Sequence, residues 1–211
     1  MLEQFESIPS NKDRQNLQGF KEWIAGNFIK EQQKYPEPEW ENKADGRSPE
    51  SAICTMLVHM NRYAKMYSRA AILDSSFSTQ EDFIYLINLN SFGAMTKMEL
   101  IKKNIQDKPT GMQIINRLIK QGWVTQSNSE NDKRSKIITI TETGKEALQA
   151  QMEKIRQATM IVSGNLDHIE KMELIRVLQK LEDFHNPIFN SSITSAELLD
   201  EVKAKYLHTQ N

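Results

Sequence analysis

The sequence predicts a mainly α-helical protein that contains one small β-hairpin. Three observations support this fold class. Apolar residues recur at helical spacing through most of the 211 residues. Between residues 123 and 141 the pattern changes to two short runs suited to strands, separated by a polar turn. Positive charge is concentrated in the same part of the chain, residues 96–137.

The first helices are predicted in the N-terminal third. Residues 11–31 carry apolar side chains at helical spacing, and a polar linker follows to Gly46. Ser48 followed by Pro49 is the N-cap and first-turn pattern of a long helix that should run to about Leu73. The residues of that helix expected to face inward are Ile53, Met56, Leu57, Met60, Ala64 and Tyr67.

Two capping boxes predict the next helix starts. Ser78 and Glu81 have the spacing of a capping box and should open one helix. Thr96 and Glu99 have the same spacing and should open a second.

A further helix and a hairpin come next. Pro109 suits the first turn of a helix, and Gly122 is placed to end it. Two strands follow, one from Trp123 and the other over 136–141. Two helices followed by a hairpin predict a winged helix-turn-helix, whose second helix is sized to enter a DNA major groove.

Charge supports this interpretation. Nine Lys and Arg residues and four Asp and Glu residues lie between 96 and 137, a net charge of +5. The whole chain carries −1, so the remainder carries −6. A basic segment in an otherwise acidic chain is typical of a surface that binds phosphates.

The C-terminal part is predicted to be helical. Thr141 should cap a helix over 142–163, and a second helix is expected over 172–184, ended by Pro187. A short final helix is expected after Thr194.

Several classes of protein are disfavoured. One cysteine excludes an intramolecular disulfide and fits a reducing, cytoplasmic location. The first residues lack the apolar run of a secretory signal, and no stretch is long and apolar enough to span a membrane. Four scattered histidines lack metal-ligand spacing. We therefore expect no metal, no cofactor and no membrane partner, and a protein that is not an enzyme.

The wing carries a specific motif. Asp132-x-Arg134, five residues, then Ile140-Thr141-x-x-Gly144 resembles the wing signature of the MarR family of bacterial transcription regulators. The segment Gly122-Trp123-Val124 is also spaced as in that family. The resemblance covers roughly residues 48–184.

The resemblance implies a domain organisation. Residues 48–184 form the MarR-like domain, with 1–47 as an N-terminal helical extension and linker and 185–211 as a C-terminal extension with a short helix. Within the domain, the winged helix-turn-helix spans about 78–144, and the dimerisation helices are 48–74 and 142–184.

The implied function is DNA binding by a homodimer. Two winged units would read a pseudo-palindromic operator, and a small effector would release it. Arg134 corresponds to the family's minor-groove arginine, which Asp132 would hold in place. Gln113 stands where many members have arginine, so the operator does not follow from the resemblance. Arg117 has two interpretations, a DNA contact or an internal ion pair.

The expected DNA-binding residues come from the second helix, its surroundings and the wing. They are Lys97, Lys108, Thr110, Met112, Gln113, Asn116, Arg117, Lys133, Arg134 and Lys136.

The long helix from Pro49 supplies candidates for an effector pocket or a sensor. They are Cys54, Met56, Met60, Tyr63 and Tyr67. Cys54 resembles in position the thiol of the peroxide-sensing branch of the family, although the partner tyrosines of that branch fall elsewhere. We favour a buried, unreactive Cys54, since free cysteine usually packs as a small apolar residue. Ordinary core packing is an equal alternative for the other four.

Three other functions were weighed. A redox regulator using Cys54 is one alternative. A winged helix that binds protein is another, and binding to DNA that does not respond to salt would favour it. A thiol peroxidase is disfavoured because the chain has no second, resolving cysteine.

Overall fold

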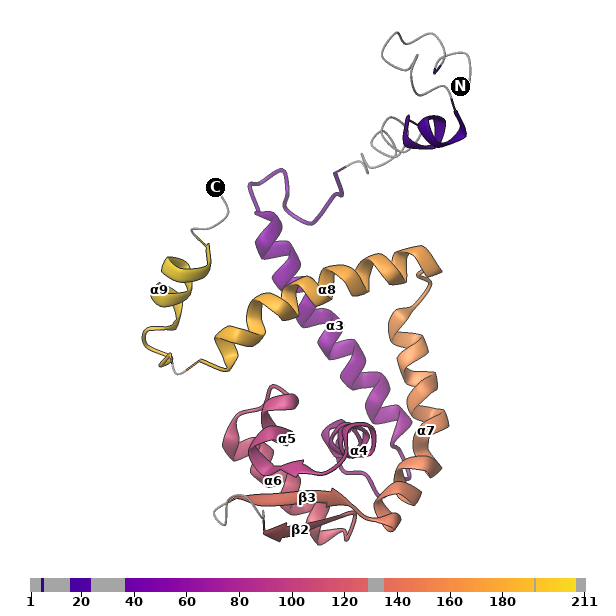
Figure 1. The fold of residues 1–211 in the computed structure, drawn as a ribbon, viewed down its shortest axis with the longest axis vertical. Helices are drawn as coiled ribbons and strands as arrows, with labels where there is room; N and C mark the ends of the chain where they lie inside the picture. The colour runs from indigo at the N-terminus through magenta and orange to yellow at the C-terminus, as the bar shows by residue number, and fades with distance from the viewer. Residues whose placement is uncertain (1–4, 6–15, 24–36, 129–134, 192, 208–211) are drawn as a thin grey trace. The chain divides into compact units, whose positions relative to one another are not determined.

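The structure, a computed structural model, describes residues 5, 16–23, 37–128, 135–191 and 193–207. The chain divides into two units, residues 1–57 and 58–211, and each is described by itself. Most described residues are helical, and one small antiparallel sheet lies in the second unit (Figure 1). The predicted fold class is therefore confirmed. None of the described helices has the length and apolar character needed to cross a membrane.

The described elements follow one another in a simple order, labelled as in Figure 1. They are α3 (Pro49–Ala71), α4 (Gln80–Phe92), β1 (Met95–Thr96), α5 (Lys97–Lys103), α6 (Lys108–Lys120), β2 (Val124–Asn128), β3 (Lys136–Ile140), α7 (Glu142–Ser163), α8 (His168–Phe189), α9 (Leu198–Val202) and a π-helical segment η2 (Lys203–Leu207).

The first unit contains a small aromatic cluster. Phe5 packs against Phe20 and Trp23 with ring centroids 5.3 and 5.6 Å away. Residues 17–23 are helical, as the apolar spacing predicts, whereas the remainder of the predicted helix 11–31 lies outside the described residues. The Trp40 indole donates to the Arg47 carbonyl at 2.8 Å and so orders the start of the segment that leads into α3.

Helix α3 begins at Pro49 as predicted and ends at Ala71, close to the expected Leu73. The prediction that its apolar face points inward is wrong for the chain alone. The side chains that are 44–54% exposed are Ile53, Met56, Leu57 and Met60, while Ala64 and Tyr67 are half-buried.

The helix-turn-helix pair is built on a close approach of α5 and α6. Thr96 and Glu99 form the predicted capping box, in which each side chain accepts from the other's backbone N–H, at 3.2 and 2.7 Å. Gly111 lets the helices meet, because a Cβ there would lie 2.4 Å from Ile101 Cγ1. Helix α4 packs against both helices and against β3, and completes the core of the winged unit.

The sheet has the strand order β1-β3-β2. The predicted hairpin is confirmed, with Val124 paired to Ile140 and Asn128 to Lys136. The pairing of Met95 with Ile138 through β1 was not predicted, because two residues are too few to produce a strand pattern. The hairpin turn, residues 129–134, lies outside the described residues.

The end of the wing is tied to the start of α7. The Thr141 hydroxyl donates to the Gly122 carbonyl at 2.7 Å and accepts from the Gly144 N–H at 3.0 Å. A Cβ on Gly144 would lie 2.2 Å from the Trp123 carbonyl oxygen, so only glycine fits. These motif residues therefore connect the end of the wing to the start of α7.

The C-terminal helices differ in part from expectation. Helix α7 has the predicted bounds. Helix α8 is longer than the predicted 172–184, because Asp167 and Glu170 form an unrecognised capping box at its start. The prediction that Pro187 ends it is wrong, since a proline in the last turn removes one helical hydrogen bond and the helix continues to Phe189. No residue of α8 is buried.

The final helix is confirmed as α9, but not its predicted cap. Glu197 itself is the N-cap residue and makes no side-chain capping bond. The Thr194 hydroxyl instead hydrogen-bonds the Glu197 carboxylate at 2.6 Å.

Candidate nucleic-acid interface

Helix α6 has one buried and one exposed side. Ile115 and Leu118 are 0% exposed within the winged core. Gln113 and Asn116 lie on the opposite side and are exposed, and Thr110 is half-buried beside them. The helix therefore presents amide and hydroxyl groups, the groups that read base edges, to solvent.

The start of α6 is fixed by a carboxylate cap. Asp107 accepts a hydrogen bond from the Thr110 N–H at 2.9 Å. The hydrogen bonds from Thr110, first from its backbone, lower the pKa of Asp107. Hydrogen bonds from Thr96 likewise lower the pKa of Glu99 at the start of α5. Both carboxylates favour the folded state above their ordinary pKa, and that contribution disappears as the pH falls through the lowered values.

The other predicted DNA-binding residues fall into three groups. Lys108 is exposed at the start of α6, and Lys97 is half-buried at the start of α5. Lys136 is exposed on β3 and donates to the Asn128 side chain. Met112 is half-buried and packs against the core, so its position favours packing over base contact. The predicted wing residues Asp132, Lys133 and Arg134 lie outside the described residues.

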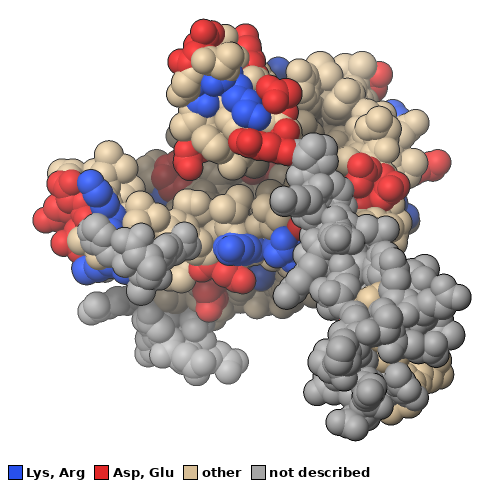
Figure 2. Space-filling model, turned by 90° about the horizontal axis from the view of Figure 1, so that it is seen from above, with Lys and Arg blue, Asp and Glu red and all other residues tan. Residues whose placement is uncertain are grey.

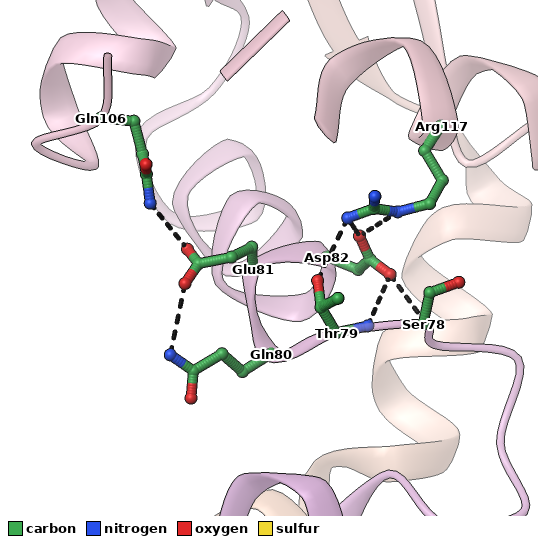
Figure 3. Close-up of polar contacts among 7 residues, drawn as sticks. All are labelled: Ser78, Thr79, Gln80, Glu81, Asp82, Gln106 and Arg117. Carbon is green, nitrogen blue, oxygen red and sulfur yellow. Dashed lines mark hydrogen bonds and ion pairs between the residues drawn. The ribbon is translucent and has the colours of Figure 1, made fainter. Parts of the chain in front are cut away.

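Arg117 forms the internal ion pair that was one of its two interpretations. Its Nε and Nη2 both donate to Asp82 Oδ1, with Nε at 2.8 Å, and Nη2 also donates to the Thr79 hydroxyl at 3.1 Å. Asp82 Oδ2 accepts from the backbone N–H groups of Ser78 and Thr79 at 2.8 and 3.1 Å. Figure 3 shows this carboxylate between the arginine and the start of α4.

This arrangement corrects the predicted cap of α4. The box is formed by Thr79 and Asp82, not by Ser78 and Glu81. Glu81 instead accepts from the Gln106 side chain at 3.3 Å, in the turn between α5 and α6 (Figure 3).

A second side-chain bond joins α4 to the same turn. The Asn88 amide donates to the Asn104 side chain at 2.8 Å, and Asn104 in turn donates to the Leu100 carbonyl at 2.7 Å. The next residue, Ile105, has a φ of 50°, which is unusual for a β-branched residue. The turn is thus held in a strained conformation by polar contacts on both sides.

The partner of Arg117 was not identified from the sequence because the two residues are far apart in it. Asp82 and Arg117 are separated by 35 residues. One local signal did point to the start of α4. Thr79 and Asp82 have the spacing of a capping box, with aspartate in place of glutamate.

Elsewhere the surface charge is mixed. On the face visible in Figure 2, the described Lys and Arg side chains lie among Asp and Glu side chains. The concentration of basic residues in 96–137 is therefore a local feature of the helix-turn-helix and wing segment.

The predicted sensor and effector residues lie along α3. Cys54 is exposed, so the favoured expectation of a buried cysteine is wrong for the chain alone. A redox role for it stays a prediction. Met56, Met60 and Tyr63 are 44–54% exposed. Tyr67 lines a cavity of about 270 Å³ between the end of α3 and α7.

A larger cavity lies between α4 and α7. Its volume is about 650 Å³, and Ile87, Met152 and Arg156 are among its lining residues. No local sequence pattern indicates this cavity, since its walls come from helices with ordinary amphipathic patterns. Among the described residues, no cluster of three or more His, Cys, Asp or Glu side chains could hold a metal ion.

Comparison with known proteins gives consistent matches. A profile of the MarR family matches residues 78–135. The chain is 30% identical over 105 residues to the HTH-type transcriptional repressor NicR of Pseudomonas putida, covering 50% of this chain and 66% of that protein. It is also 30% identical over 105 residues to the organic hydroperoxide resistance transcriptional regulator of Bacillus subtilis, covering 49% and 70%.

A solved structure shares the fold. The structure of Bordetella bronchiseptica BpsR, described for the regulation of its DNA binding by 6-hydroxynicotinic acid, superposes with a TM-score of 0.58. The match covers 62% of this chain and 98% of BpsR at 22% identity.

Proposed function

Because this chain belongs to the MarR family of transcriptional regulators, we propose that it binds double-stranded DNA as a homodimer and is released by a small effector. The observation that carries the proposal is the exposed side of α6. Its core side is buried against the chain's own helices, while Gln113 and Asn116 remain exposed on a helix that begins with an exposed lysine.

In this proposal the major groove receives α6. Gln113 would bond a base edge, with Thr110 and Asn116 beside it. Lys97, Lys108 and Lys136 would contact phosphates, which position the protein without reading sequence. From the resemblance, the sequence-predicted wing residue Arg134 would enter the minor groove, with Lys133 on the backbone and Asp132 in support.

Apolar side chains on the terminal helices support the dimer. Helix α8 has no buried residue, and large apolar side chains along α3 and α8 are exposed in the single chain. Burial of such faces by a second copy is the ordinary solution in soluble proteins. The faces include Met60, Tyr63 and Met66 on α3 and Ile169, Met172, Ile175 and Leu178 on α8.

The cavity between α4 and α7 supports effector binding. Its volume of about 650 Å³ falls within the range of small-molecule sites, about 300–1,000 Å³. Helix α4 also carries the contacts to the turn and to α6. A ligand there would therefore act on the element that holds the reading helix.

The test separates base reading from phosphate binding. DNA selected from a random library by the wild-type protein and an unselected duplex are titrated by fluorescence anisotropy across a salt series. Gln113→Ala should weaken the selected DNA alone, by about tenfold, and leave the salt slope unchanged. Arg134→Ala should weaken both DNAs and reduce the slope by about one.

Lys203→Ala in η2 is the matched control, because it removes an exposed charge outside both the DNA-reading segment and the proposed dimer faces. It should change neither affinity. Failure of the wild-type protein to enrich any sequence, together with salt-independent binding, would refute the proposal and favour a protein-binding winged helix.

A further inference from the structure

A group of three side chains, which we name the α4–α6 clamp, links the start of α4 to α6. It consists of Thr79, Asp82 and Arg117. The Asp82 side chain is 1% exposed and uses both of its oxygens, one for the α4 backbone and one for the arginine. Arg117 is 31% exposed and has Nε and Nη2 committed to the clamp.

We propose that Arg117 is a positioning residue for DNA reading, which acts through Asp82 and makes no contact with DNA. The proposal rests on the proposed function, because it names what orients the reading helix. It assigns the same role to Asp82, an acidic residue that would otherwise be expected to disfavour DNA.

Helix geometry explains why the clamp controls reading. Arg117 follows Gln113 by four residues, about one helical turn, so the two side chains share an edge of α6. A bond that fixes Arg117 therefore fixes the rotation of that edge about the helix axis. Arginine suits this role because its planar, rigid fork of donors can reach Asp82 and Thr79 together, whereas lysine offers a single point charge.

The α4–α6 clamp also holds the first turn of α4. One carboxylate accepts from the Ser78 and Thr79 N–H groups and from Arg117, so an opening of the first turn of α4 would release α6 as well. The contacts of Glu81 with Gln106 and of Asn88 with Asn104 hold the turn ahead of α6 from the same helix. The orientation of α6 is thus set from α4.

The substitution Asp82→Asn distinguishes a positioning role of Arg117 from a phosphate-binding role, because the two roles predict opposite changes in DNA affinity. Simple electrostatics predicts tighter DNA binding, since one negative charge is removed and Arg117 would be freed for a phosphate. The clamp predicts weaker binding to the selected sequence, since the neutral amide holds the guanidinium less firmly. Thr79, the N-cap residue of α4, is unchanged in this variant, so α4 should still form.

The experiment measures Kd per active molecule for the wild-type protein, Arg117→Ala, Arg117→Lys, Asp82→Asn and the double variant Asp82→Asn with Arg117→Ala. The probes are a duplex selected from random DNA by the wild-type protein and an unselected duplex. Each is titrated by anisotropy across a salt series at a temperature where circular dichroism shows folded protein. Lys120→Ala, an exposed cation three residues further along α6, is the matched control.

The clamp predicts one pattern. All three single variants should lose about tenfold on the selected duplex, with the unselected duplex nearly unchanged, because misplacement of α6 forfeits a base contact. The salt slope of Arg117→Lys and Arg117→Ala should equal that of the wild-type protein. The double variant should lose no more than either single variant, as expected for two residues that act as one unit.

Three results would overturn the proposal. A phosphate-binding Arg117 would give a slope reduced by about one for Arg117→Ala, wild-type behaviour for Arg117→Lys and tighter binding for Asp82→Asn. A purely structural pair would lower the active fraction but leave the ratio of the two affinities unchanged. A wild-type protein that selects no sequence would refute the proposed function itself, an outcome distinct from the other two.

Discussion

Helices α6 and α8 both carry an apolar side, but only one of them is covered. On α6, Ile115 and Leu118 are 0% exposed, packed in the core that α4, α5 and the sheet complete. On α8, Ile175 and Leu178 are 47% and 42% exposed, and no residue of the helix is buried. An amphipathic sequence therefore does not by itself determine whether the apolar side of a helix is buried within one chain.

The contrast distinguishes the folding stability of one chain from the stability of its association with a second copy. The winged unit buries its apolar side chains within one chain, so a defect there should act at any protein concentration. In the proposed dimer a second copy covers the faces of α3 and α8, so a defect there should appear in the association equilibrium. Three substitutions test this difference between the helices and the core of the winged unit.

The largest effect is expected in the winged core. Ile115→Ala should lower the free energy of unfolding by about 3 kcal/mol, because it leaves a cavity at a fully buried site. Urea denaturation followed by circular dichroism, at two protein concentrations, would measure it. The loss should be the same at both concentrations, and a loss confined to the dilute sample would contradict the comparison.

A smaller effect is expected on α8. Leu178→Asp should weaken dimerisation by about 2 kcal/mol, near thirtyfold in the dissociation constant, as for a central interface residue. Sedimentation velocity over a concentration series would measure it. Ala204→Asp adds the same charge at an exposed position of η2, outside the proposed faces of α3 and α8, and is the control. If Leu178→Asp dimerised like wild type, the exposed face of α8 would not be the interface.

The smallest effect concerns a buried hydroxyl in the winged core. Tyr85 is 0% exposed, and its hydroxyl has no hydrogen-bond partner among the described residues. Burial, then the negative charges of Glu81 and Asp107, raise the pKa of Tyr85 from 10.0 to about 12. Tyr85→Phe should therefore raise the free energy of unfolding by about 1 kcal/mol.

The pH dependence of this stability has a definite sign. With a raised folded-state pKa, the wild-type protein keeps its full stability below pH 10 and loses part of it as the pH rises toward 12. Tyr85→Phe should remove that loss, as pH-dependent urea titrations would show. Destabilisation by Tyr85→Phe would mean that the hydroxyl has a partner.

Local signals allowed much of the winged unit to be predicted. The box of Thr96 and Glu99 and the cap at Thr141 depend on residues three apart, so the sequence displays both partners together. The alternating hairpin is visible for the same reason.

Other features depend on contacts between distant residues or on weaker local patterns. The Arg117–Asp82 pair joins residues on separate helices, and nothing in either local pattern identifies the partner. The capping box of Asp167 and Glu170 is local, but it begins with aspartate and was not recognised. Pro187 was expected to end α8, whereas the helix continues through it to Phe189. The exposure of Cys54 depends on tertiary packing around α3, and no local sequence pattern records such packing.

The hydrogen bonds of Thr141 with Gly122 and Gly144 tie the end of the wing to the first turn of α7. Helix α7 has 22 residues, which corresponds to about 33 Å at the α-helical rise. A tilt of about 5° at its far end would displace the wing by about 3 Å, close to the spacing of about 3.4 Å between successive nucleotides of a DNA strand. In the proposed DNA complex, a bend of about 5° where α7 meets α8, if carried along α7, would move the wing by about one base pair.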